Sequence, residues 1–280
     1  MHLKDFIHVI DQLPWLRILN LWHRGEPTVA PDFVAMVAEA SRRRIWTQTH
    51  TNGILIARDD LADRIVEAGL NKITIGIDGS DEETYSMVRR GGSLAEVEAG
   101  VRALVSARSK RKSRKPKIIA ECLLTRQAQD QFQTIYDMAL SWGVDKVLFK
   151  TYRVPDLDNL DEVLKRLPDN PKLWRYRKTN DHLEMNGALT RCHRLAYSAV
   201  IAWNGEVLPC CFSTNDFHSM GNSFKQPWKE IWKSQTLREF QRVVNSGGRE
   251  KIPMCRNCTE GLKRLYLGKG IVFPSSEFAI

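Results

Sequence analysis

The sequence predicts an α/β fold, in which a parallel sheet curls into a barrel or part of one and is followed by a small cysteine-rich region. Two observations support this prediction. Strand-like and helix-like segments alternate from Leu16 to Lys150, and the alternation stops near Pro155. Five of the six cysteines then lie between Cys192 and Cys258. Repeated strand–helix units indicate a parallel sheet with helices packed outside it, and right-handed crossovers curl such a sheet.

The alternating region is expected to contain five strands, because five short runs are apolar or β-branched. These runs are Leu16–Leu21, Ile45–Thr49, Ile73–Ile77, Ile118–Leu124 and Lys146–Phe149. Helices are expected where apolar residues recur at helical spacing, namely at 3–10, from 33 onward, and at 61–70, 82–89, 94–107 and 132–142. Asp59-Asp60 suits a helix start, while Gly69 and Gly143 suit helix ends.

After residue 155 the sequence no longer alternates between strand-like and helix-like segments. Residues 156–190 are expected to form a polar, partly helical connector. Ala199–Trp203 and Glu206–Leu208 predict a hairpin across Asn204-Gly205, a turn pair that tolerates positive φ. Two short helices are expected at Pro227–Trp232 and Leu237–Val244. We therefore expect a barrel-like domain over 1–155, a connector over 156–190 and a cysteine-rich domain over 191–280.

Composition narrows the class of protein. The net charge of +9 comes partly from the run Arg108–Lys117, in which no aromatic residue interleaves. Base-stacking platforms need such aromatics, so the run is interpreted as a solvated loop and no nucleic-acid partner is expected. No apolar run of about 18 residues predicts a membrane span, and no signal-peptide pattern begins the chain. A cytoplasmic location is therefore expected.

The cysteine pattern predicts a metal centre. Cys192 and Cys210 flank the predicted hairpin, and Cys255 and Cys258 form a Cys-x-x-Cys knuckle. In a reducing cytosol, cysteines spaced in this way favour metal binding over disulfides. Spacing alone does not separate a zinc site from an iron–sulfur cluster. Cys211 is interpreted as packing or at most a spare ligand, and Cys122 as a buried small hydrophobe.

Three short polar motifs follow predicted strands. They are Gly25-Glu26-Pro27, Thr51-Asn52-Gly53 and Asp78-Gly79. In barrel-like architectures the chemistry collects at the C-terminal ends of the strands. These motifs are therefore the first candidates for a binding site.

In order and spacing these motifs, together with Ile75-Gly76-Ile77, Tyr85 and Arg89, resemble the radical S-adenosylmethionine (SAM) enzymes. The C-terminal pattern resembles the SPASM domain that caps many of those enzymes. That pattern is Cys192-x12-Gly205-x4-Cys210, Gly221-Asn222, Trp228–Trp232 and Cys255-x2-Cys258. The resemblance implies a partial (β/α) barrel of the radical SAM type lacking its first strand, and it favours a [4Fe–4S] cluster over zinc on Cys192, Cys210, Cys255 and Cys258.

The resemblance also implies roles for residues at the strand ends. Glu26, within Gly25-Glu26-Pro27, matches the acidic residue that holds the amino group of SAM, and Arg89 matches a basic position that faces the SAM carboxylate. Asp78 and Asn52 match positions that line the cofactor pocket. Two departures, Arg24 and Gly76 in place of the family's usual Gly and Ser, are expected to alter how the cofactor is held.

The family's Cys-x3-Cys-x2-Cys motif is absent, and no cysteine precedes Cys122. We expect a fragment or, as the second explanation, a degenerate member, and this chain alone is not expected to cleave SAM. For the complete protein, the resemblance implies cleavage of SAM to a 5′-deoxyadenosyl radical, which abstracts hydrogen from an unknown peptide, sugar or small molecule. An electron donor such as a flavodoxin or ferredoxin is also implied. The alternative is a non-enzymatic zinc module whose basic loop binds an anionic partner.

Overall fold

The computed structural model describes residues 1–154, 159–180, 182–185, 192–213, 218–256 and 258, which form two compact units. The first, here called the sheet unit, contains residues 17–153 and 160–174. The second, here called the cysteine unit, contains residues 1–16, 154, 159 and the described residues from 175 to 258. The two units interleave along the chain, and the domain boundaries expected at 155/156 and 190/191 stay predictions.

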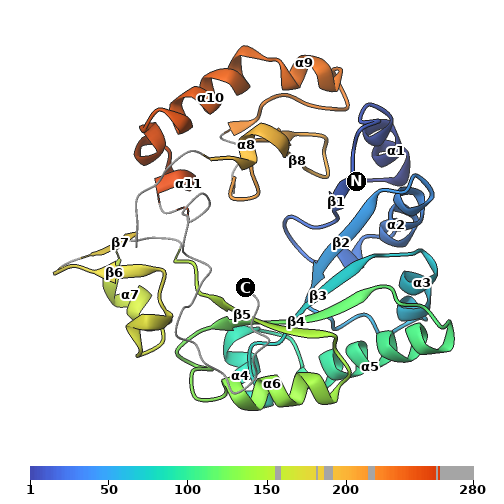
Figure 1. Ribbon diagram of the computed structural model, residues 1–280, viewed down its shortest axis with the longest axis vertical. Helices are drawn as coiled ribbons and strands as arrows, with labels where there is room; N and C mark the ends of the chain where they lie inside the picture. Colours follow the sequence, from blue (N-terminus) through green and yellow to red (C-terminus); the bar gives the residue numbers. More distant parts are fainter. Residues whose placement is uncertain (155–158, 181, 186–191, 214–217, 257, 259–280) are drawn as a thin grey trace. The chain divides into compact units, whose positions relative to one another are not determined.

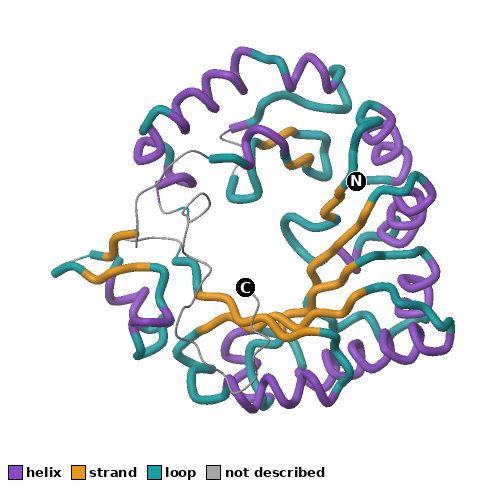
Figure 2. The backbone as a smooth tube through the Cα atoms, in the orientation of Figure 1, coloured by secondary structure: helices purple, strands orange, loops and turns teal. Residues whose placement is uncertain are grey.

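The sheet unit contains the predicted parallel sheet. Its strands are β1 (Ile18–Asn20), β2 (Trp46–Thr51), β3 (Lys72–Gly76), β4 (Lys117–Leu124) and β5 (Lys146–Thr151). They lie in the order β1-β2-β3-β4-β5, and every neighbouring pair is parallel. Figure 2 shows these strands as orange segments that lie side by side. Parallel neighbours that are consecutive in sequence require a crossover each time. The sheet therefore confirms the α/β fold predicted from the alternation.

Helices supply these crossovers and lie along one face of the sheet (Figure 1). They are α2 (Phe33–Arg42), α3 (Leu61–Glu67), α4 (Glu82–Val88), α5 (Leu94–Lys110) and α6 (Phe132–Ser141). The short helix α7 (Leu160–Leu164) follows the last strand and supplies no crossover. Local signals explain their limits. The Asp81 carboxylate accepts a hydrogen bond from the Thr84 N–H at the start of α4. Gly69 and Gly143 adopt positive φ just beyond α3 and α6.

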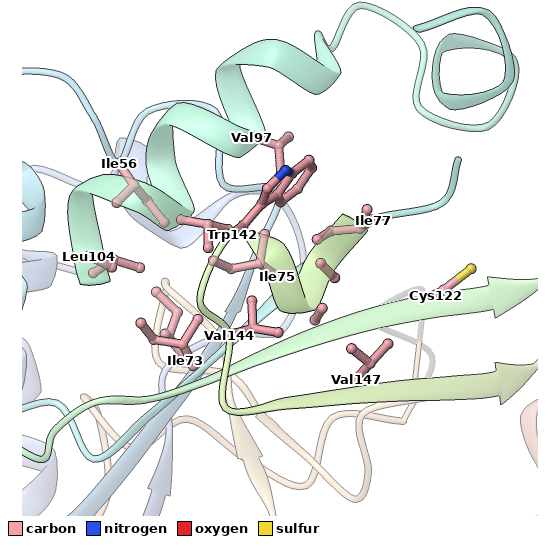
Figure 3. Packing of buried hydrophobic residues seen from close by; sticks show 14 of the residues in the cluster. Ile56, Ile73, Ile75, Ile77, Val97, Leu104, Cys122, Trp142, Val144 and Val147 are labelled. Carbon is pink, nitrogen blue, oxygen red and sulfur yellow. The ribbon is translucent and has the colours of Figure 1, made fainter. Parts of the chain in front are cut away.

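The hydrophobic core lies between the sheet and these helices (Figure 3). Ile73, Ile75 and Ile77 are fully buried and share one cluster with Val97 and Leu104 of α5. Each such side chain stabilises the fold by about 1.5–3 kcal/mol when it is buried. Because side chains alternate along a strand, the positions between these isoleucines point to the opposite face of the sheet. That opposite face, here called the open face, carries the polar groups described below.

The predicted basic loop is partly helical. α5 continues to Lys110, so the loop that was expected over 108–117 begins only after this residue. Arg108 pairs with Asp145 at 2.5 Å, and Arg111 pairs with Glu67 at 2.9 Å. These ion pairs hold the first part of the run against neighbouring elements. No helix among the described residues is long and apolar enough to cross a bilayer.

The cysteine unit is built from short elements. Its helices are α1 (Leu3–Asp11), α8 (Arg194–Tyr197), α9 (Trp228–Trp232), α10 (Gln235–Asn245) and α11 (Pro253–Arg256). β8 (Val200–Ile201) and β9 (Val207–Leu208) form the predicted hairpin. β6 (Tyr176–Lys178) and β7 (Leu183–Met185) form a second antiparallel pair that the sequence did not predict.

α1 is tied to the C-terminal part of this unit by one side chain. The Gln12 amide oxygen accepts a hydrogen bond from the Trp228 N–H at 2.7 Å, and its Nε2 donates to the Ser223 carbonyl at 3.3 Å. Both partners are backbone groups, so the contact fixes the path of the chain. The N-terminal helix therefore belongs to the same compact unit as α9.

Candidate functional site

Glu26 is held at the C-terminal ends of β1 and β2. It caps the 3₁₀ turn η1 (Pro27–Val29), and Gly25 before it has φ +73°. Its Oε1 accepts hydrogen bonds from the Thr28 N–H, the Thr28 hydroxyl and the Thr51 hydroxyl at 3.1, 2.6 and 2.6 Å. Among the described residues, the Asn52 N–H alone donates to its Oε2, at 2.7 Å. A carboxylate has about four acceptor positions, so Oε2 keeps capacity for a cationic ligand group.

Asn52 contributes its backbone to this arrangement. Its side-chain Oδ1 accepts a hydrogen bond from the Ile54 N–H at 3.0 Å and closes the turn. Gly53 follows with φ +85°, and a Cβ there would lie 2.8 Å from Ile75 Cγ2. The turn after β2 therefore fixes the N–H that donates to Glu26. The Asn52 side chain is used within the turn.

Asp78 and Arg89 form a partly buried ion pair at the end of β3. The Asp78 side chain is fully buried, and its Oδ2 lies 2.6 Å from Arg89 Nε. Its Oδ1 accepts the Leu123 N–H at 2.7 Å. Burial alone would lower the pKa of Arg89, but the charge and hydrogen bond of Asp78 raise it. Asp78 thus joins the β3 end to β4 and orients the guanidinium.

Gly76 makes room for that guanidinium. A Cβ built on Gly76 would overlap Arg89 Nη2 and lie 2.9 Å from Cζ. The end of the Arg89 side chain therefore covers this position on the open face. The structure explains why glycine stands here in place of the family's usual serine, because any side chain at position 76 would displace Arg89.

A third polar group on the open face was missed by sequence reasoning. Glu121 of β4 lies 3.4 Å from His50 Nε2 and 2.5 Å from Lys150 Nζ. Burial would raise the pKa of Glu121, but the hydrogen bond from His50 and the charge of Lys150 outweigh it and lower the pKa to about 2. A charged residue inside the apolar run Ile118–Leu124 was the available signal, since buried parallel strands are usually apolar throughout.

In the cysteine unit, the four predicted ligands line one pocket. Cys192, Cys210, Cys255 and Cys258 share it with five apolar side chains, Leu195, Phe212, Phe240, Val244 and Met254, and with Arg194 and Arg249. The structure thus brings together thiols separated by up to 66 residues of sequence, from position 192 to position 258.

Local hydrogen bonds hold these cysteines. The Cys192 N–H donates to Asn245 Oδ1 at 2.9 Å, at the end of α10. Cys210 Sγ accepts the Phe212 N–H at 3.2 Å, an interaction common at metal-bound thiolates. The Cys258 N–H donates to the Cys255 carbonyl at 3.2 Å and closes the knuckle. Backbone and amide groups therefore set the positions of all four.

The spacing of bound thiolates differs between a zinc ion and an iron–sulfur cluster. Four thiolates about 2.3 Å from one tetrahedral zinc lie about 3.8 Å apart. Among the described residues, no three His, Cys, Asp or Glu side chains are close enough to share one ion. The corners of an iron–sulfur core hold their thiolates farther apart. All four thiols line one pocket, and the described residues offer no set that converges on a single ion.

Neighbouring groups shift the pKa of the Cys210 thiol. Its hydrogen bond with Cys211, then burial and the charges of Cys211 and Cys258, raise this pKa above its usual range. Cys210 is partly buried, and a thiol that binds a metal ion does so as the thiolate. Cys211 itself is exposed, and its Sγ lies 3.6 Å from Arg194 Nη1. It is not among the residues that line the pocket.

Comparisons with known families match both parts of the chain. Residues 19–119 match the radical SAM superfamily, and residues 192–259 match the SPASM family, an iron–sulfur cluster-binding domain.

Individual relatives are distant. The tungsten-containing aldehyde ferredoxin oxidoreductase cofactor-modifying protein of Pyrococcus furiosus is 23% identical, over 91% of this chain and 78% of its own length. The mycofactocin maturase MftC of Mycolicibacterium smegmatis is 26% identical, over 89% of this chain and 66% of its own length. The S-adenosyl-L-methionine-dependent 2-deoxy-scyllo-inosamine dehydrogenase of Niallia circulans is 26% identical, over 47% of this chain and 46% of its own length.

Solved structures share the fold. Native anSMEcpe with bound AdoMet superimposes with a TM-score of 0.61 at 16% identity, over 95% of this chain and 84% of that one. BtrN in complex with AdoMet and 2-DOIA gives a TM-score of 0.52 at 16% identity, with the same two coverages. At these identities the likeness shows the fold alone.

Proposed function

Because this chain belongs to the radical SAM superfamily and carries a C-terminal SPASM iron–sulfur cluster-binding domain, we propose that it forms the SAM-binding and cluster-binding parts of a modifying enzyme. SAM would bind at the strand ends through Glu26 and Arg89. A [4Fe–4S] cluster would bind to Cys192, Cys210, Cys255 and Cys258. When bound, these groups supply one-electron cleavage of SAM and hydrogen abstraction from a substrate.

The observation that carries the SAM site is the fixed carboxylate of Glu26. Four hydrogen bonds hold it, while Oε2 keeps an acceptor position for an ammonium group. Gly25 and Pro27 set the turn that presents it. Arg89 offers the opposite charge for a carboxylate, and Asp78 keeps its guanidinium oriented. Asn52 acts through its N–H, which holds the carboxylate of Glu26.

Relatives support an enzyme without naming its substrate. Their printed names describe a cofactor-modifying protein, a dehydrogenase and a maturase. These names support modification of a substrate, which we expect to be a peptide, a sugar or another small molecule. A reduced flavodoxin or ferredoxin would supply electrons. Cysteines spaced for metal binding fit a reducing cytoplasm.

The 280 residues offer no ligand set for a cluster beside SAM. No cysteine precedes Cys122, and Cys122 is fully buried in β4, where burial raises its pKa well above the usual value. One isolated thiol cannot supply the several thiolates that hold an iron–sulfur cluster. This chain alone is therefore expected to bind SAM without cleaving it.

Calorimetric titration with SAM tests the binding site. Glu26→Gln removes the negative charge that an ammonium group requires, and Arg89→Met removes the cation for the carboxylate. Each should weaken SAM binding at least tenfold, which corresponds to about 1.4 kcal/mol. Glu98→Gln, at an exposed ion pair on α5, is the matched control and should bind as the wild type does. Equal affinity in Glu26→Gln and the wild type would remove Glu26 from the site.

Anaerobic reconstitution with iron and sulfide tests the cluster. About four irons per chain and a broad visible absorption band are expected. Cys255→Ser should lose both, while Cys122→Ser should keep both, because Cys122 lies in the sheet unit. Tight zinc binding with no visible band would contradict the cluster.

A further inference from the structure

The open face of the sheet carries more cations than anions. Because side chains alternate along each strand, the positions on this face include four lysines, Lys72, Lys117, Lys146 and Lys150, and one carboxylate, Glu121. The helices that connect the strands lie along the other face (Figure 1). The strands therefore give the open face a positive charge.

Glu121 connects side chains from two other strands through its carboxylate. His50 Nε2 of β2 lies 3.4 Å from its Oε1, and Lys150 Nζ of β5 lies 2.5 Å from its Oε2. β3 lies between β2 and β4, and neighbouring strands are about 4.8 Å apart, so His50 and Glu121 meet above β3. The register places the small residues Thr74 and Gly76 beside them, which leaves room for this contact. Both oxygens of Glu121 are thus engaged.

The Lys150 ammonium keeps donors that Glu121 does not use. An ammonium group has three N–H donors, and Glu121 is the only carboxylate among the described residues within ion-pair distance of Lys150. The Lys150 side chain is 45% exposed, whereas that of Glu121 is 11% exposed. A ligand on the open face can therefore reach the ammonium group more readily than the carboxylate.

Lys72 is a second cation on this face. It is partly buried, and its Nζ lies 5.6 Å from the centre of the Trp46 ring on the neighbouring strand β2. Within the described part of the chain, no carboxylate lies within ion-pair distance of Lys72. Burial lowers the pKa of Lys72 and the charge of Lys150 lowers it further, while the charge of Glu121 raises it. The positive charge of Lys72 is thus only partly balanced, and an anion bound beside it would balance it further.

We propose that the open face binds an anionic group of the substrate, a carboxylate or a phosphate, between Lys72 and Lys150. Charge-assisted hydrogen bonds from the two ammonium groups would hold it. The site lies beside the proposed SAM site, since Gly76, which the Arg89 side chain covers, is the register partner of Glu121. The inference rests on the proposed function and deepens it, because it specifies the charge of a substrate that the proposed function leaves open.

Phosphorus NMR of inorganic phosphate, titrated with the full chain at constant ionic strength, tests the proposal. The wild type should broaden the phosphate line, and succinate should displace phosphate, whereas uncharged glucose should not. The anion that binds more tightly identifies the group that the site prefers. Lys72→Met and Lys150→Met should each weaken phosphate binding about fivefold, and Lys72→Arg should restore part of the loss. Lys110→Met, at an exposed lysine of α5 on the other face, is the matched control and should bind as the wild type does.

Several results would overturn the inference. They are wild-type affinity for phosphate in either folded lysine variant, and a wild-type chain that binds neither anion. If Lys150→Met does not fold because Glu121 loses its partner, Lys72→Met decides, because Lys72 has no such ion pair to lose. Phosphate binding that SAM displaces, or that Arg89→Met abolishes, would place the anion in the SAM site and also overturn the inference. If SAM does not bind while phosphate binding still depends on Lys72 and Lys150, the SAM assignment fails and the anion site is supported.

Discussion

Gly76→Ala should displace Arg89 and weaken the partly buried ion pair with Asp78. The new Cβ would lie 2.9 Å from Arg89 Cζ, whereas carbon atoms in contact prefer about 3.5–4.0 Å. The guanidinium must therefore retreat by roughly 1 Å. That shift lengthens the Nε–Oδ2 distance from 2.6 Å to about 3.5 Å, outside the hydrogen-bond range.

Gly76→Ala should lower the free energy of unfolding for two reasons, overpacking and a weakened ion pair between Asp78 and Arg89. Overpacking costs about 1–3 kcal/mol, and complete loss of one partner of a buried pair costs about 3–5 kcal/mol. Because the ion pair is stretched and not removed, we expect about 2 kcal/mol. Hydrogen exchange of the Leu123 amide, which donates to Asp78, should then become about thirtyfold faster. Mass spectrometry of peptides covering 117–124 measures this rate.

A double-mutant cycle separates this mechanism from a general loss of stability. In an Arg89→Met background the methionine side chain has no ion pair with Asp78 that holds it in place. Gly76→Ala should therefore lower the free energy of unfolding much less than it does in the wild type. The coupling between the two substitutions should be about 1–2 kcal/mol. Additive effects within about 0.5 kcal/mol would refute the idea that Gly76 exists to seat Arg89.

Three further outcomes follow from the described contacts. In the folded protein the pKa of Glu121 is about 2, below the usual 4.5. The ionised carboxylate therefore stabilises the folded state fully above pH 4.5, and this contribution is lost as the pH falls through 2. Urea unfolding should show Glu121→Gln less stable by about 3 kcal/mol at pH 7 and by less than half of that at pH 3, and a gap independent of pH would contradict the ion pairs. Gly100→Ala would overlap the Gly53 carbonyl oxygen and should lower the melting temperature by several degrees, whereas unchanged melting would mean that α5 moves freely. Asn245→Ala removes the acceptor of the Cys192 N–H and should reduce the iron retained against a chelator, while equal retention would show that this hydrogen bond is dispensable.

Much of the sheet unit could be predicted from sequence because its signals are local. Apolar runs, helical spacing and glycine stops identified every strand of the parallel sheet. The hairpin across Gly205 was also predictable, because the turn requires positive φ and Gly205 adopts +86°. The β6–β7 pair was not, since its strands have three residues each and carry charged side chains that hide any alternation.

The site was predictable in part for a related reason. Glu26 could be found because a polar motif ends an apolar strand. The bond between Asp78 and Arg89 depends on how α4 ends, and the contacts of Glu121 depend on the register of β2, β4 and β5. Register is a property of the assembled sheet, and sequence reasoning had no access to it.

The bond between Gln12 and Trp228 also has a consequence for biosynthesis, because its partners are 216 residues apart in sequence. At a synthesis rate of about 5–20 residues per second, roughly 10–40 s pass between the emergence of the first helix and that of its partner. During that interval α1 cannot reach its final place, although its apolar residues Phe6, Val9 and Ile10 have already left the ribosome. This helix therefore waits for a partner that is synthesised much later, and a chaperone would be expected to shield it in that interval.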